Sequence, residues 1–121
     1  MRLLQVDAPE AGSECYAGAA ARALARLTPV GAEVVLESDP ALDRVDRFGR
    51  LLRYVRSGAL NVNVELVRRG AATPYFYHGE RGRYASRLLA AARDARAARR
   101  GMWGACEVSW APTRQVDTRF P

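Results

Sequence analysis

The clearest pattern in the sequence is a helical repeat of apolar residues towards its C-terminal end. Six residues are spaced four, three, four, three and four positions apart: Tyr84, Leu88, Ala91, Ala95, Ala98 and Met102. This spacing places them on one face of a helix, so it predicts a long amphipathic helix that ends near Gly101. We expect the face that carries Tyr84, Leu88 and Met102 to lie in the core.

Two shorter helices are predicted earlier in the chain. Apolar residues recur at helical spacing from Tyr16 to Leu27, and Pro29 ends this segment. Asn61 can cap a second, short helix with its side-chain oxygen, and Gly70 can end it.

Short extended segments separate these helices. We predict strands over 2–6, 34–36 and 50–56, and an extended or loop segment over 75–78. No periodicity is visible after Trp103, so residues 104–121 are predicted to be an irregular tail behind a domain of residues 1–103. A chain of 121 residues suits one such domain, whereas two separate cores would each be marginal.

Composition narrows the class of protein. Hydrophobic residues make up 49% of the chain and charged residues 26%, which is typical of a folded protein and not of a disordered one. No apolar run reaches the roughly 18 residues that cross a bilayer. The N-terminus also lacks a charged leader followed by an apolar stretch, so we expect a soluble protein with no membrane contact and no secretory signal in this chain.

The basic residues favour a partner that carries phosphate. All 19 are arginine, and the formal net charge is +6. Guanidinium groups stay charged and bind phosphate through paired donors, which indicates a nucleic-acid partner. A genome that replaces lysine by arginine throughout would produce the same composition, so charge alone is a weak indicator.

Carboxylates and arginines also stand at the ends of predicted strands. Asp7 and Glu10 follow the first strand and flank a proline turn, where two carboxylates can hold a hard cation or activate water. Arg2 and Arg50 lie at or near the beginning of two strands, and two such guanidinium groups could stabilise a phosphodiester transition state. Spacing alone favours the simpler interpretation, which is a solvated turn with surface salt bridges.

The two cysteines, Cys15 and Cys106, lie too far apart for a close-spaced zinc motif, and His78 is the only histidine. They are either two buried thiols or one disulfide that encloses most of the chain. In the chain-entropy model such a disulfide stabilises the fold by about 4–5 kcal/mol in an oxidising compartment.

Five segments occur in the order and approximate spacing typical of one family of nucleases. They are R-L-L-Q-V-D-A-P-E at 2–10, D-R-F-G-R at 46–50, V-N-V-E-L-V-R-R-G at 62–70, Y-F-Y at 75–77 and R-R-G-M-W at 99–103. Through them the chain resembles the staphylococcal nuclease (thermonuclease) family over residues 2 to about 103. The resemblance implies an α+β fold, in which three helices pack against a five-stranded barrel of the oligonucleotide-binding (OB-fold) type.

The resemblance also implies roles for individual residues. Arg2 and Arg50 match the two arginines that bind the scissile phosphate and stabilise its transition state, and Glu10 matches the general base toward the attacking water. Asp7 matches a side-chain ligand of calcium, and Ala8 stands where a threonine contributes its backbone carbonyl to the ion.

Further matches concern the nucleotide and the cysteines. Tyr75 and Tyr77 match aromatic residues near the bound nucleotide, and Arg47 stands where a lysine contacts a terminal phosphate. Because relatives of this family are secreted and would oxidise paired thiols, the resemblance favours a disulfide between Cys15 and Cys106.

The activity implied is calcium-dependent endonucleolytic hydrolysis of DNA or RNA, with little sequence preference and 3′-phosphate ends. The family's first two barrel strands and a D-G-D-T-like segment, whose aspartate is a second calcium ligand, have no counterpart in this chain. We therefore expect an N-terminally truncated barrel, weak metal binding, and an open edge that can pair with another chain in a dimer.

Three explanations account for the shortened barrel. The first is that the start of the chain is set too late, so that the missing strands and a secretion signal are encoded upstream. In that case we expect a secreted protein; otherwise we expect a cytoplasmic one. The second is a short chain completed by a partner or by swapping within a dimer. The third is a remnant that binds nucleic acid without cutting it.

Overall fold

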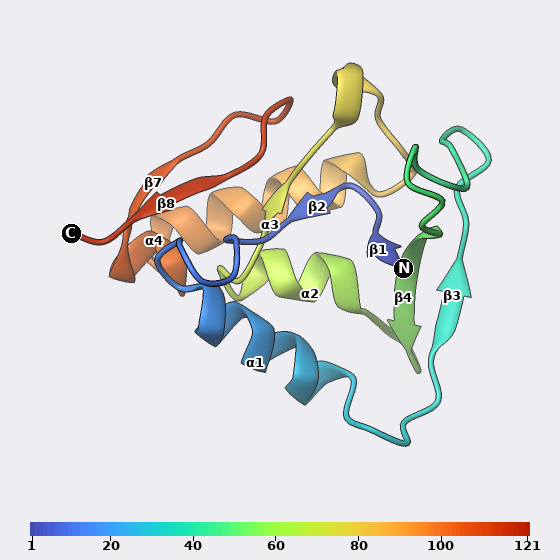
Figure 1. The fold of residues 1–121 in the computed structure, drawn as a ribbon, viewed down its shortest axis with the longest axis horizontal. Coiled ribbons are helices and arrows are strands. Elements are labelled where there is room, and N and C mark those ends of the chain that lie inside the picture. The colour runs from blue at the N-terminus through green and yellow to red at the C-terminus, as the bar shows by residue number, and fades with distance from the viewer.

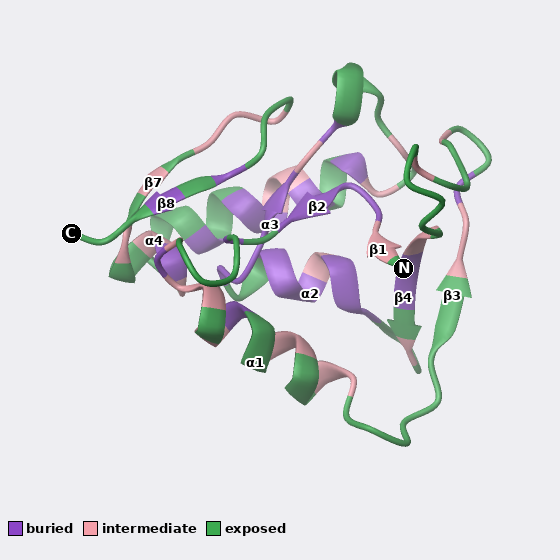
Figure 2. Cartoon of the chain, viewed as in Figure 1, coloured by how far each residue is buried: buried purple, intermediate pink, exposed green.

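Helix α2 (Val62–Arg68) lies between the longer helices α1 (Ala17–Leu27) and α3 (Ala85–Ala97) in the computed structural model, which describes residues 1–121 (Figure 1). The inner sides of these helices and the strand β4 (Leu52–Ser57) enclose the hydrophobic core (Figure 2). The largest fully buried apolar side chains are those of Tyr54, Val62, Val67, Phe76, Leu88 and Met102. All three predicted helices are present, and none is long and apolar enough to cross a membrane.

The start of α2 confirms a local prediction. The side-chain oxygen of Asn61 accepts a hydrogen bond from the backbone amide of Val64 at 3.0 Å, so the helix begins at the predicted cap. Within the helix, the buried amide of Asn63 accepts from Val55 N and donates to Leu4 O, both at 2.9 Å. Asn63 thus connects α2 to strand β4 and to the N-terminal segment at Leu4.

The last helix is shorter than its apolar spacing predicts. Helix α3 ends at Ala97 because Arg99 adopts a positive φ of 55° and the chain turns. The backbone of Gly101 then packs against the backbone of Gly70, and Met102 N donates to Gly70 O at 2.9 Å. Met102 is buried as expected, but it begins a separate short helix, α4 (Met102–Ala105).

The strands form small sheets and no closed barrel. Strand β4 pairs in parallel with β1 (Arg2–Leu3) and antiparallel with β3 (Val35–Glu37) and β5 (Leu60–Asn61). Strand β2 (Val6–Asp7) pairs with β6 (Thr73–Pro74). Because β1 and β3 flank β4 without pairing with each other, the sheet stays open. The α+β class is confirmed, whereas the five-stranded barrel is not seen as a closed sheet.

The strand predicted over 2–6 is broken in two at Gln5, which has a positive φ of 63°. The buried Gln5 side chain donates to Glu80 O at 2.9 Å and accepts from Gly82 N at 2.8 Å. These bonds hold the loop that precedes α3. The chain therefore leaves one sheet after Leu3 and enters another at Val6.

Residues 104–121 are not the irregular tail that the sequence predicts. They contain the end of α4 and an antiparallel hairpin of β7 (Glu107–Ser109) and β8 (Asp117–Arg119). A disulfide between Cys15 and Cys106 joins the hairpin to the loop before α1, and Trp110 Nε1 donates to Pro74 O at 2.9 Å. Contacts with residues distant in sequence hold this segment in place, and the periodicity of the sequence does not indicate such contacts.

Candidate active site

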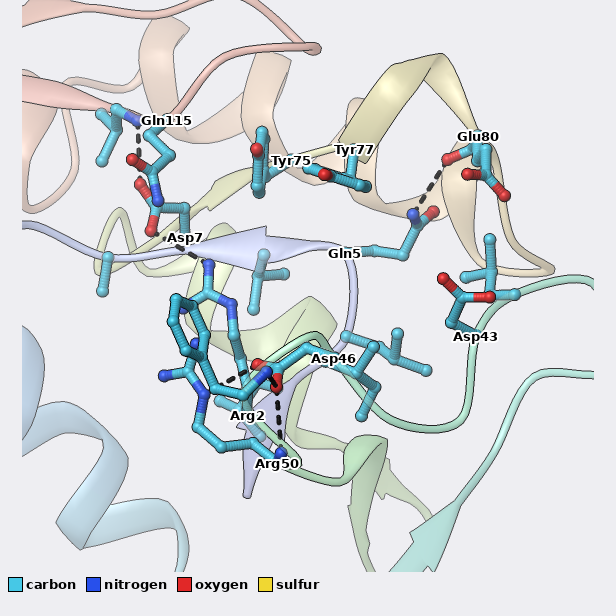
Figure 3. Close-up of a pocket in the computed structure, with 18 of the residues that line it drawn as sticks. Arg2, Gln5, Asp7, Asp43, Asp46, Arg50, Tyr75, Tyr77, Glu80 and Gln115 are labelled. Atoms are coloured by element: carbon cyan, nitrogen blue, oxygen red, sulfur yellow. Dashed lines mark hydrogen bonds and ion pairs between the residues drawn. The ribbon is translucent and has the colours of Figure 1, made fainter.

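One cleft gathers every residue that the resemblance links to catalysis, metal binding or nucleotide binding. Its volume is about 1200 Å³, and strands β1 and β2, the turn over 46–50, the segment after β6 and residues 115–117 line it (Figure 3). The eight residues are Arg2, Asp7, Ala8, Glu10, Arg47, Arg50, Tyr75 and Tyr77. They come from three separate segments of the chain, 2–10, 47–50 and 75–77, so only the tertiary fold brings them together.

Arg2 and Asp7 form an ion pair on the floor of the cleft. Arg2 Nη2 lies 3.3 Å from Asp7 Oδ1, and the second carboxylate oxygen of Asp7 accepts from the amide of Val116 at 2.9 Å. Burial raises the pKa of Asp7 above its ordinary value, against the hydrogen bonds from Val116 and Arg2. Asp7 therefore orients the guanidinium group of Arg2, which stays about a third exposed.

Arg50 is oriented by a tight turn. Asp46 accepts hydrogen bonds from the amides of Phe48 and Arg50, each at 2.9 Å, and its other oxygen lies 2.7 Å from Arg50 Nε. The ring of the exposed Phe48 lies between two cations, with Arg47 Cζ 4.8 Å and Arg50 Cζ 5.4 Å from its centroid. This turn presents two guanidinium groups and an aromatic ring at the rim of the cleft.

Glu10 lies exposed on the loop that follows β2. Its backbone amide donates to Glu14 Oε1 at 2.6 Å, which holds the loop at this point. Its carboxylate and the two arginines line the same cleft, as a general base and two phosphate-binding groups must.

Aromatic rings form the wall after β6. The rings of Tyr75 and Tyr77 meet edge to face with centroids 6.4 Å apart, and His78 stacks on Tyr77 at 4.0 Å. Tyr77 is about half exposed, so one ring remains available to a base.

Residues 1–105 match a family model described as staphylococcal nuclease homologue. The chain belongs to the staphylococcal nuclease family. The match includes all eight residues of the cleft that the resemblance singles out. No match was found among curated proteins. A domain of this family therefore spans most of the chain, and the hairpin lies almost wholly outside the matched residues.

Calcium is the metal that this nuclease family implies, and the donors of this chain do not fit it as they lie. Calcium takes six to eight oxygen ligands. Both oxygens of Asp7 already accept hydrogen bonds, from Arg2 and from Val116. No group of three or more Asp, Glu, His or Cys side chains lies close enough to hold an ion.

Several residues of the nuclease cleft were not singled out from the sequence. They are chiefly Glu14 and three residues of the C-terminal segment, Gln115, Val116 and Asp117. The C-terminal segment shows no periodicity and lies beyond the resembling motifs. One signal pointed to it, because a bond between Cys15 and Cys106 must bring the segment back to the loop next to Glu10.

Proposed function

We propose that the protein is a phosphodiesterase that hydrolyses DNA and RNA internally, with little sequence preference, and leaves 3′-phosphate ends. The family supports a nuclease. The observation that carries the proposal is the presence of Arg2, Glu10 and Arg50 in a single cleft, although Arg50 lies 40 residues beyond Glu10 in the sequence.

The chemistry follows from these side chains. Arg2 and Arg50 bind the scissile phosphate and stabilise the negative charge that grows on its oxygens in the transition state. Glu10 accepts a proton from water as the water oxygen attacks phosphorus. The bond from phosphorus to the 5′-oxygen breaks, and the 5′-oxygen takes up a proton, so the products are a 3′-phosphate and a 5′-hydroxyl.

The remaining cleft residues contact the nucleotide. Tyr77 and Tyr75 offer ring surfaces to a base, and Arg47 offers a guanidinium group to a neighbouring phosphate. Stacking and phosphate contacts are open to every base, which accounts for hydrolysis with little sequence preference.

Calcium enters the proposal from the family alone, with Asp7 and the Ala8 carbonyl as its expected ligands. Asp7 is the one carboxylate among these expected ligands, and no group of three or more Asp, Glu, His or Cys side chains is placed to hold an ion. We therefore expect weak calcium binding, in the range of about 10⁻⁴ to 10⁻³ M or weaker.

Digestion of plasmid DNA and of RNA tests the proposal. We expect cleavage with calcium that a chelator suppresses, and a fall in kcat/KM of roughly 100-fold or more in Arg50→Ala, because a donor to the transition state is lost. Arg93→Ala is the matched control, since Arg93 is exposed on α3 outside the cleft. Wild-type protein that cuts neither substrate with calcium present contradicts the proposal.

A second candidate is a nucleic-acid-binding module without catalysis, and the lack of a cluster of three or more metal-binding side chains favours it. This candidate predicts salt-sensitive binding of an oligonucleotide that neither calcium nor Glu10→Gln changes. The nuclease hypothesis predicts that Glu10→Gln keeps this binding but loses the hydrolysis that the wild-type protein shows. The binding module predicts hydrolysis by neither protein.

Pairing with a second chain is also proposed, at the open edge of the sheet. The strand β3 pairs with β4 on one side only, and it exposes Val35 and Leu36 at this edge of the sheet. Light scattering that gives the mass of a monomer across the working concentration range contradicts a dimer.

The disulfide further supports an oxidising compartment, in line with secretion.

A further inference from the structure

Two carboxylates bind the loop around Glu10 to strand β8. Asp7 Oδ2 accepts from the amide of Val116, and Glu14 Oε2 accepts from the amide of Thr118, both at 2.9 Å. Successive amides of a strand face opposite edges, so amides two residues apart face the same side. Glu14 thus occupies the edge of β8 where a further strand would pair, and Asp7 binds the residue that directly precedes β8.

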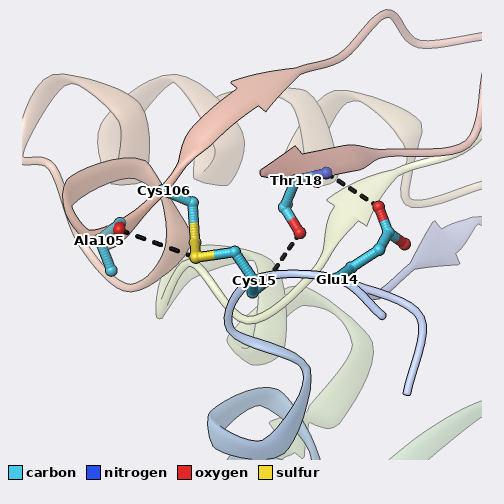
Figure 4. Close-up of a disulfide and its surroundings, with 5 residues drawn as sticks. All are labelled: Glu14, Cys15, Ala105, Cys106 and Thr118. Carbon is cyan, nitrogen blue, oxygen red and sulfur yellow. Dashed lines mark hydrogen bonds between the residues drawn. A yellow bond between two sulfur atoms is a disulfide. The ribbon is translucent and has the colours of Figure 1, made fainter. Parts of the chain in front are cut away.

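The end of this loop is also attached covalently. Thr118 Oγ1 donates to Cys15 O at 2.6 Å, and Cys15 is disulfide-bonded to Cys106 at the start of the hairpin (Figure 4). Thr118 is buried beneath these contacts. The loop and the hairpin are therefore held together at the residue that follows Glu14.

The Glu14 carboxylate links β8 directly to the proposed base. While Oε2 accepts from Thr118, Oε1 accepts from the backbone amide of Glu10 at 2.6 Å. A carboxylate offers an acceptor to each amide at once, which no other side chain of this size does. The backbone of Glu10 is consequently held from the hairpin, although Glu10 itself is exposed.

We infer that Glu14 is a positioning residue for the proposed hydrolysis. It holds the backbone of Glu10 so that the Glu10 carboxylate faces the water that attacks the phosphate. This inference rests on the proposed role of Glu10 as general base. A displacement of about 1 Å of a catalytic group can cost on the order of 100-fold in rate, so a brace on the backbone of the base is enough to matter.

The test replaces Glu14 by its isostere. In Glu14→Gln the side-chain NH₂ must face one of the two amide donors, so one of the two hydrogen bonds is lost. We expect kcat to fall roughly 10- to 100-fold with KM within about twofold, because Arg2 and Arg50 still bind the phosphate. A role limited to stability would lower the folded fraction without this separation of kcat from KM.

Two further variants complete the design. Glu107→Gln removes an exposed carboxylate from β7 of the same hairpin and should keep the wild-type kcat. Glu14→Asp keeps the charge but shortens the reach, and should lower kcat in the same direction as Glu14→Gln. It serves as the test variant if Glu14→Gln does not fold.

Amide hydrogen exchange measured by NMR without substrate gives a readout that is independent of activity. We expect whichever of the Glu10 and Thr118 amides loses its acceptor to exchange at least about tenfold faster in Glu14→Gln, while amides within α3 keep their rates. Unchanged exchange at both amides overturns the inference, and so does wild-type kcat in folded Glu14→Gln. Wild-type protein without any hydrolysis overturns the proposed function itself, which the other two outcomes leave standing.

Discussion

The backbone amide of Val116 donates a hydrogen bond of 2.9 Å to Oδ2 of Asp7, and so joins the two ends of the chain inside the cleft. The other oxygen of Asp7 lies 3.3 Å from Arg2 Nη2. The carboxylate expected to bind calcium is thus already a link between a phosphate-facing arginine and the C-terminal hairpin.

The buried carboxyl of Asp7 makes a prediction about pH. Burial raises its pKa in the folded protein above the ordinary value of 3.8, against the hydrogen bonds from Val116 and Arg2. The folded state therefore holds this proton more tightly than the unfolded state, and the contribution of Asp7 to stability falls as pH rises from 3.8 through the folded pKa. We expect Asp7→Asn to remove this fall. Urea unfolding of both proteins from acid to neutral pH measures it, and parallel pH profiles would contradict it.

Asp39 makes a prediction of opposite sign. Burial opposes its ionisation, but hydrogen bonds from Tyr54 Oη at 2.6 Å and from the amide of Arg83 at 2.9 Å outweigh burial and lower its pKa. Its contribution to stability is therefore present above 3.8 and lost as pH falls through the folded pKa. We expect Asp39→Asn to cost about 1–3 kcal/mol at neutral pH and less in acid. Asp43→Asn, an exposed carboxylate of the same loop, is the control in urea unfolding.

Alanine substitutions at Gly101 and Gly12 distinguish the cost of steric overlap from the cost of backbone strain. Both have positive φ, 55° and 85°, but a Cβ at Gly101 would meet the carbonyl oxygens of Gly70 and Arg69, whereas one at Gly12 meets nothing within 4 Å. We expect Gly12→Ala to cost about 1–2 kcal/mol from strain, and Gly101→Ala to cost about 1–3 kcal/mol more from overpacking. Equal midpoints of unfolding for the two variants would show that the backbone contact at Gly101 is unimportant.

The disulfide between Cys15 and Cys106 spans 91 residues in sequence. A crosslink over a loop of this length restricts the unfolded chain, so the double serine variant should lose about 4–5 kcal/mol in the chain-entropy model. Denaturant unfolding with and without a dithiol reductant measures the loss. Reduced wild-type protein should match the double variant, and the double variant should not respond to reductant; a response from it would point to an unrelated effect.

Asp46 is predicted to act on the reaction through Arg50. Its carboxylate holds Arg50 Nε at 2.7 Å and the amides of the turn. In Asp46→Ala the guanidinium group remains but is less well oriented, so kcat/KM should fall roughly tenfold, and less than in Arg50→Ala. Steady-state hydrolysis of an oligonucleotide measures this order of effects. If Asp46→Ala matches wild type while Arg50→Ala is inactive, the turn does not orient Arg50.

Helices were the part of the fold that local sequence determined. Apolar spacing and one capping side chain, Asn61, suffice because the bonds of a helix join residues close in sequence. The same local reasoning predicted α3 to continue to about Gly101, although it ends at Ala97. The turn at Arg99 depends on the contact between Gly101 and Gly70, which are distant in sequence.

The eight site residues named by resemblance do lie in one cleft, and their chemical roles stay predictions. By contrast, the sequence did not indicate Glu14 or Val116 as part of the site. Their hydrogen bonds, from Thr118 to Glu14 and from Val116 to Asp7, each join positions more than 100 residues apart. No period or motif encodes such a bond, because it depends on where two distant segments meet.

By itself, the sequence determined the helices, because their apolar spacing is local, and its motifs, through their resemblance to a nuclease family, indicated the α+β class and the site residues. Only the tertiary structure decided that the first strand breaks at Gln5, that the sheet stays open and that residues 104–121 return to the cleft. The physical reason is that buried polar groups must find partners: the buried Gln5 and Asp7, and the partly buried Glu14, find theirs in segments far from them in sequence.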